Sequence, residues 1–160
     1  VAGLLGMKPD DLRIPDSFTA AKQQGLRFTI HPVQLREAHP NTALIQVQGA
    51  SGKPLSLQAA STGGGRIRVD KLNGVEVRFT GQFHTLVIRH QDIAGELADV
   101  ARELSNARIN IANMNLCRDR RGGDVLTVIE TDQRVPPVVR QLMGELEGVD
   151  DVTYYEKEDD

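Results

Sequence analysis

The feature that most constrains the fold is the order of apolar runs in residues 83–160. The run "HTLVIRH" is continuous, as expected for a central buried strand. Apolar side chains then recur at helical spacing from Ile93 to Leu104, which predicts an amphipathic helix. Two strand-like segments, a second helix and a last strand follow: "RINIANMNL", "DVLTVIETD", "PPVVRQLMGELEG" and "VDDVTYYE". This βαββαβ order predicts the split ferredoxin-like arrangement.

The second predicted strand is unusual because it contains Asn110, Asn113 and Asn115. Asparagine is a poor strand former, so strand propensity does not account for these side chains. Simple alternation places four residues on one face of this strand: Ile109, Ile111, Asn113 and Asn115. We interpret the stretch from residue 89 to residue 119 as half of a small ligand-binding module.

Residues 1–82 predict a different kind of structure. "PDSFTAAKQQG" predicts a short helix that Asp16 or Ser17 caps and Gly25 ends. "LRFTIH" alternates and predicts a strand, and four more strand-like runs follow it: "NTALIQVQG", "PLSLQAAST", "RIRVDKL" and "VEVRFTGQ". The dipeptide Asn73-Gly74 predicts a hairpin between the last two runs, with Ile67, Val69 and Leu72 directed toward a core.

The predicted fold class is therefore α+β. An N-terminal helix plus an antiparallel β-meander domain occupies residues 1–82, and the βαββαβ domain occupies residues 83–160. The chain starts with the apolar "VAGLLG" and has no initiator methionine, so we expect the first domain to lack its natural N-terminal part.

Charge and cysteine content limit the classes of function. The 160 residues have a net charge of -3, with an excess of positive charge in residues 1–82 and of negative charge in residues 83–160. The acidic second half argues against nucleic acid as a partner. No apolar run approaches the roughly 18 residues that a membrane span needs, so we expect no membrane partner. A single cysteine, Cys117, excludes an internal disulfide and favours a reduced, cytoplasmic location.

The sequence contains no recognisable catalytic group and no recognisable metal site. The four histidines, His31, His39, His84 and His90, are not paired at metal-ligand spacing. A cysteine-held zinc or iron–sulfur site needs three or four thiolates, and this chain has one. We therefore expect no catalytic residue and no bound metal on this chain.

The segment "HQDIAGELAD" is the strongest candidate for ligand binding. A strand ends at His90, Asp92 lies in the loop after Gln91, and Gly95 opens a helix whose N-terminal N–H groups suit a carboxylate. Asp92 suits an ammonium group, so the segment fits an amino acid, and Asn110 is expected to reach the same loop. The alternative is that Asp92 only caps the helix.

The segment "STGGGRIR" is a second, weaker candidate. Consecutive backbone N–H groups in a glycine-rich connection form an anion nest in some proteins, and an arginine adds positive charge. The candidate residues are Ser61, Thr62, Gly63, Gly64, Gly65 and Arg66. The alternative, which we favour on physical grounds, is a flexible connection between strands whose glycines allow positive φ.

The second half resembles an ACT domain, the regulatory module of many amino-acid enzymes. The Asp/Asn-x-Pro-Gly loop of that family corresponds to "DIAG", with Ala94 in place of proline, and "INIANM" is similar to its second strand. The resemblance implies effector contacts from His90, Asp92, Ala94, Gly95 and Asn110. It also implies a homodimer formed through this domain.

The whole chain resembles the β chain of bacterial iron–sulfur L-serine dehydratase (L-serine ammonia-lyase). The residues responsible are "DDLRIPDSFTAAKQQG", "HPNTALIQV", "STGGGRI" and "LNGVEVRFTG". The resemblance implies an allosteric-substrate-binding domain before the ACT domain, and conversion of L-serine to pyruvate and ammonia. It implies a [4Fe-4S] cluster on a partner α chain, none on this chain, and L-serine or another amino acid as effector.

Two alternatives remain open from the sequence. The first is an effector-binding fragment of D-3-phosphoglycerate dehydrogenase, in which the same pair of domains occurs. The second is a ferredoxin-like RNA-binding module, which should carry aromatic and basic residues on its central strands. "HTLVIRH" and "DVLTVIE" do not show that pattern. We also expect this chain to be inactive by itself.

Overall fold

The computed structural model describes residues 1–49, 52–118 and 124–157, and the chain divides into two compact units, Val1–Arg36 and Glu37–Asp160. The first unit contains two 3-10 turns, η1 (Ala2–Leu5) and η2 (Ile14–Asp16), and one helix, α1 (Ser17–Gln23). As predicted, Gly25 follows this helix in the left-handed conformation, with φ of 76°.

Asp16 is the N-cap of α1, as predicted, but no side chain among the described residues forms a capping hydrogen bond there. The prediction of a strand at "LRFTIH" was wrong. Residues 26–31 form no strand. Alternation of side chains does not make a strand unless a second strand accepts its hydrogen bonds, and none of the described strands pairs with this segment.

The second unit begins with the predicted meander. Its strands are β1 (Thr42–Gln48), β2 (Pro54–Gly63), β3 (Arg66–Leu72) and β4 (Val75–Phe79), in the order β1-β2-β3-β4, and each neighbour is antiparallel. Asn73 and Gly74 have φ of 49° and 84°, so the predicted hairpin turn is confirmed.

The predicted core side chains of this hairpin are only partly buried. Val69 and Leu72 are buried, and a register shift between Val69 and Lys71 brings these two residues into the same core. Ile67 was predicted to be buried and is 49% exposed. It lies near the turn that joins β2 and β3, where it pairs with Ser61, outside the buried cluster.

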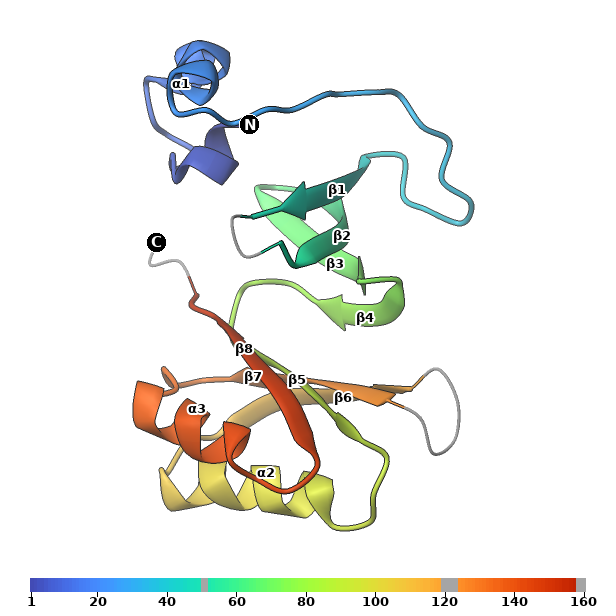
Figure 1. The fold of residues 1–160 in the computed structure, drawn as a ribbon, viewed down its shortest axis with the longest axis vertical. Helices are drawn as coiled ribbons and strands as arrows, with labels where there is room; N and C mark the ends of the chain where they lie inside the picture. Colours follow the sequence, from blue (N-terminus) through green and yellow to red (C-terminus); the bar gives the residue numbers. More distant parts are fainter. Residues whose placement is uncertain (50–51, 119–123, 158–160) are drawn as a thin grey trace. The chain divides into compact units, whose positions relative to one another are not determined.

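The predicted βαββαβ domain is also confirmed (Figure 1). Its elements are β5 (His84–Gln91), α2 (Glu96–Asn106), β6 (Ile111–Arg118), β7 (Asp124–Thr131), α3 (Pro137–Gly144) and β8 (Val149–Tyr155). The strand order is β6-β7-β5-β8, and each neighbouring pair is antiparallel. Ile93, which we expected on the helix, precedes α2 and is 51% exposed because helical geometry starts only after Gly95.

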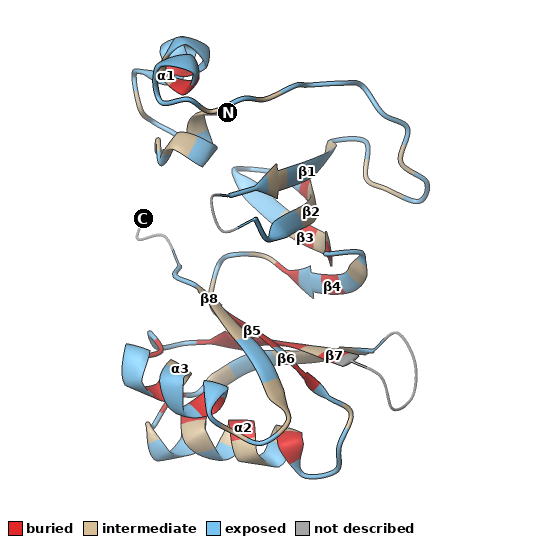
Figure 2. Cartoon of the chain, viewed as in Figure 1, coloured by how far each residue is buried: buried red, intermediate tan, exposed pale blue. Residues whose placement is uncertain are grey.

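The second sheet is covered on both faces (Figure 2). On one face, α2 and α3 bury an apolar core whose members include Leu86, Ile88, Leu104, Ile129 and Met143. On the other face, β3 and β4 of the meander pack on Val87 and Val128. The ring of Phe79 also stacks on Tyr155 of β8, with centroids 6.1 Å apart. The meander and the ACT-like sheet therefore share one core.

The strand β6 contains a β-bulge that the sequence pattern did not reveal. Ile111 pairs with Thr131, whereas Asn113 pairs with the adjacent residue Glu130. The extra residue at Ala112 reverses the alternation, so Ile111 and Met114 contact the helix-side core. The prediction that Ile111 shares a face with Asn113 and Asn115 was wrong for this reason.

Candidate functional site

The loop between β5 and α2 has the geometry expected of a helix N-terminus that is open to a ligand. Gly95 is the N-cap of α2 with φ of 103°, as we predicted, and its carbonyl accepts hydrogen bonds from Ala98 and Asp99. No side chain among the described residues caps this helix, and Ala94 is exposed. The first N–H groups of α2 therefore remain available to a carboxylate.

His90 supports this loop from inside the domain. It is only 3% exposed, its Nε2 lies 2.8 Å from Thr127 Oγ1, and its Nδ1 lies 2.9 Å from the carbonyl oxygen of Gln91. A carbonyl only accepts, so Nδ1 donates, and in the neutral ring Nε2 accepts from the Thr127 hydroxyl. Both ring nitrogens are thus engaged within the chain.

Asp92 has a cationic partner that sequence reasoning missed. Arg118 Nη1 at the end of β6 lies 3.1 Å from Asp92 Oδ2. The Arg118 side chain is 50% exposed and that of Asp92 is 23% exposed. Arg118 opens the basic stretch "RDRR", of which residues 119–121 lie outside the described residues. A carboxylate and a guanidinium therefore meet beside the N-terminus of α2.

Glu96 is a second residue that the sequence did not single out. It is buried at the start of α2, and its Oε1 has no hydrogen-bond partner among the described residues. Gly148 lies so close that a Cβ at this position would be 2.7 Å from Glu96 Oε2. Acidic residues are common in the first turn of a helix because the helix dipole favours them there. The sequence pattern therefore offers no reason to expect that Glu96 is buried.

Asn110 lies at the opposite end of the sheet from the loop. It precedes β6, whose first residue pairs with Thr131, and Thr131 in turn pairs with His84 at the start of β5. The length of β5 separates this end from Asp92, roughly 20 Å at the usual rise of a strand. The expectation that the Asn110 amide reaches the loop of its own chain was wrong, because β6 runs parallel to β5.

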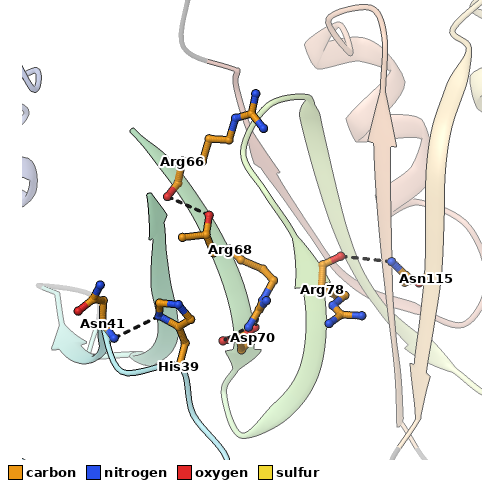
Figure 3. A network of polar contacts seen from close by, with 8 residues as sticks. His39, Asn41, Arg66, Arg68, Asp70, Arg78 and Asn115 are labelled. Carbon is orange, nitrogen blue, oxygen red and sulfur yellow. Dashed lines mark hydrogen bonds and ion pairs between the residues drawn. The ribbon is translucent and has the colours of Figure 1, made fainter. Parts of the chain in front are cut away.

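The other two asparagines contact the meander side. Asn115 Nδ2 donates to the carbonyl oxygen of Arg78 on β4 at 3.2 Å (Figure 3). Asn113 Nδ2 donates to Glu130 Oε2 at 3.0 Å, and Glu130 Oε1 accepts from the backbone N–H of Thr80 at 3.2 Å. Glu130 is buried, so these hydrogen bonds compensate for burying its carboxylate. Asn113 and Asn115 thus have a structural role in this chain.

The glycine-rich segment is an exposed hairpin turn. Strand β2 ends at Gly63, β3 begins at Arg66, and Gly64 and Gly65 between them have φ of 60° and 73°. Thr62 Oγ1, two residues from the turn and next to Ser61, donates to the carbonyl oxygen of Arg66 at 3.3 Å. These positive φ values account for the glycines without a ligand.

A neighbouring arginine has its own partner. Arg68 Nε lies 2.5 Å from Asp70 Oδ1, and this hydrogen bond raises the pKa of Arg68 (Figure 3). Its charge is therefore compensated within β3.

An iron–sulfur cluster does not fit on this chain. Within residues 1–49, 52–118 and 124–157, no three His, Cys, Asp or Glu side chains form a group that could hold a metal ion. Cys117 is the one cysteine of the sequence, and burial, followed by the charge of Glu76, raises the pKa of its thiol. A cluster needs three or four thiolates, so no chemical step is assigned to such a group here.

Comparison with known proteins agrees with the fold. A model of the ACT domain family matches residues 84–148. The chain is 31% identical to "Probable L-serine dehydratase, beta chain" of Bacillus subtilis (strain 168), over 96% of this chain and 69% of that protein. It is 29% identical to "L-serine dehydratase, beta chain" of Peptoniphilus asaccharolyticus, over 96% of this chain and 68% of that protein.

A different enzyme shares part of this similarity. D-3-phosphoglycerate dehydrogenase of Bacillus subtilis (strain 168) is 26% identical over 82% of this chain, which is 24% of that enzyme.

The βαββαβ sheet and the match over residues 84–148 define an ACT-domain protein. Within that class, the similarity over almost the whole length shows that the chain belongs to the family of L-serine dehydratase beta chains. Among the described residues, no helix is both long and apolar enough to cross a membrane.

Proposed function

We propose that this chain is the regulatory beta chain of a cytoplasmic L-serine dehydratase, which converts L-serine to pyruvate and ammonia together with an alpha chain. The observation that carries the proposal is similarity to two beta chains over 96% of this chain. A [4Fe-4S] cluster belongs to the alpha chain in this proposal, since the single cysteine here is insufficient to hold one.

The ACT domain serves as the sensor of an amino-acid effector, L-serine or a close relative. Asp92, Ala94 and Gly95 supply one end of the effector site and Asn110 the other. The loop offers the N–H groups of α2 for a carboxylate, and Asn110 offers an exposed amide. His90 is assigned to this site as the buried support of the loop, since both its ring nitrogens already have partners.

A homodimer explains how two ends roughly 20 Å apart serve one ligand. The strand β6 is at an edge of its sheet. Antiparallel pairing of two β6 strands would place Asn110 of one chain near Arg118 of the other, and Arg118 contacts Asp92. A two-fold axis then creates two equivalent sites, and pairing also covers two exposed sheet edges.

Calorimetric titration of the chain with L-serine, with D-serine as the control ligand, tests the effector site. Saturable binding of L-serine that Asp92→Ala weakens at least tenfold, about 1.4 kcal/mol, supports the proposal. Asp150→Ala is the matched control because Asp150 is an exposed carboxylate on β8, the other edge strand. Absence of L-serine binding by the folded protein would count against an effector role.

A pyruvate assay tests whether the reaction requires the alpha chain. This chain alone should form no pyruvate from L-serine, whereas addition of a cluster-bearing alpha chain should produce activity. Pyruvate formation by the purified beta chain alone, with contaminating enzyme excluded, would refute this part of the proposal.

Anion binding by the turn at Ser61–Arg66 is a separate proposal. It rests on the exposed turn and on the positive charge of Arg66. Titration with inorganic phosphate should show binding that Arg66→Gln abolishes. If phosphate does not bind, or if Arg66→Gln binds it as tightly as the wild type, the glycines serve only the geometry of the turn.

A further inference from the structure

The turn after β7 holds Asn110 by three hydrogen bonds. The backbone N–H of Asn110 donates to Gln133 Oε1 at 2.7 Å, and its carbonyl oxygen accepts from the N–H of Asp132 at 3.1 Å. Its amide nitrogen, Nδ2, donates to Asp132 Oδ2 at 2.5 Å. An asparagine that is exposed to solvent is therefore held in one position by residues 22 and 23 positions later in the chain.

The chemistry of Asp132 determines which way the Asn110 amide points. An ionised carboxylate only accepts hydrogen bonds, so it must face the NH₂ group of the amide rather than the oxygen. This argument fixes the assignment of nitrogen and oxygen independently of their similar shapes. Among the described residues, Oδ1 is then the one polar heavy atom of Asn110 without a partner.

The electrostatics at this end favour a cation. Asp132 forms no ion pair with any of the described cationic side chains, whereas the neighbouring Arg134 is paired with Glu156 at 2.8 Å. An approaching ligand therefore meets an acceptor oxygen backed by a carboxylate. The other end of the proposed site offers the first N–H groups of α2, which favour an anion.

We propose that Asp132 is a positioning residue that makes the Asn110 end select the ammonium group of the effector. In the proposed dimer, the effector then lies with its ammonium group at Asn110 Oδ1 of one chain and its carboxylate at the N-terminus of α2 of the other. Asp132 thereby makes the site prefer an amino acid over the 2-hydroxy acid of the same shape. This inference rests on the proposed effector function, and it adds the orientation of the ligand and the residue that sets it.

The test compares two ligands and three proteins. L-Serine and L-glycerate differ at the carbon next to the carboxylate, where an ammonium group is replaced by a hydroxyl. Calorimetric titration should show that the wild-type protein binds L-serine at least tenfold more tightly than L-glycerate. In Asp132→Asn this ratio should fall by a factor of about ten, because the carboxylate is lost and the Asn110 amide is free to turn over. Asp150→Asn, which removes an equal charge from β8, should keep the wild-type ratio.

The ratio separates positioning from a merely structural role. A loosened turn would weaken both ligands equally and leave the ratio unchanged, and that result would overturn the inference. Absence of L-serine binding by the wild-type protein would overturn the effector function itself. If Asp132→Asn unfolds, Asp132→Glu provides the second variant. It keeps the charge and should retain a preference for L-serine, and a loss of that preference would overturn the inference.

Discussion

The two ends of the ACT sheet are built in different ways. At the end of β5, a buried histidine supports a short loop, a left-handed glycine starts a helix, and Arg118 contacts Asp92. At the start of β6, an exposed asparagine is held by the turn after β7. The first end is therefore packed into the core, whereas the second is held at the surface by hydrogen bonds.

This difference teaches where each end can tolerate change. Residues of the loop end are coupled to packing, so substitutions there should affect stability and binding together. Asn110 and Asp132 contact each other at the surface, so substitutions there should affect binding almost alone. Four experiments test this contrast, from the largest expected effect to the smallest.

His90→Ala should lower the free energy of unfolding by about 3 kcal/mol. It leaves a cavity and removes the partners of Thr127 and of the Gln91 carbonyl. Urea denaturation measures this loss. His31→Ala, at an exposed position outside the helices and strands, is the control and should change stability by less than about 0.5 kcal/mol. Equal stability of the two variants would show that the hydrogen bonds and packing of His90 do not stabilise the loop.

Gly148→Ala should cost about 2 kcal/mol of stability. Gly148 has φ of 88°, its carbonyl accepts from the N–H of Gln91, and an added Cβ would displace Glu96. Gly95→Ala is the matched variant because φ is 103° but nothing lies within 4 Å of the added Cβ. Thermal unfolding should therefore place Gly95→Ala between the wild type and Gly148→Ala. The reverse order would contradict the close packing of Glu96 on Gly148.

Asn110→Ala should weaken L-serine binding at least tenfold, about 1.4 kcal/mol, and should change the free energy of unfolding by less than about 1 kcal/mol. Its side chain is exposed, and its backbone contacts with residues 132 and 133 remain in the variant. Calorimetry and urea denaturation of the same sample give both values. A large loss of stability with unchanged L-serine binding would show that Asn110 stabilises the fold and does not bind the effector.

Cys117 lies in β6 between the two ends, and its alkylation tests the packing there. Burial raises the pKa of the thiol, so less thiolate is present at pH 8 than in an exposed cysteine. Iodoacetamide should therefore react more slowly with the folded protein than with the same protein in urea. Equal rates would show that the meander does not cover this part of β6.

Much of this fold was predictable from local signals. A continuous apolar run predicted β5, and Asn73-Gly74 predicted the hairpin between β3 and β4. These signals succeed because the physical cause lies within a few neighbouring residues. "LRFTIH" failed because a strand also needs a partner, and nothing within the six residues tells whether a partner exists.

The site was less predictable because its parts are set by tertiary structure. Gly95 was identified correctly from its place before a helix. The engagement of His90 by Thr127, the contact of Arg118 with Asp92 and the hold of Asp132 on Asn110 each join residues 22 to 37 positions apart. The bulge at Ala112 has no sequence signal either, and it decides which asparagines face the meander.

The most direct test of the account mixes two defective variants, Asn110→Ala and Asp92→Ala. A site shared between two chains predicts that each variant alone binds L-serine poorly. After exchange of chains in an equal mixture, half of the dimers are mixed and each has one intact site, so about a quarter of all sites should recover. Native mass spectrometry confirms the exchange, and calorimetry counts the sites. Exchange without any recovery of L-serine binding would contradict the shared site.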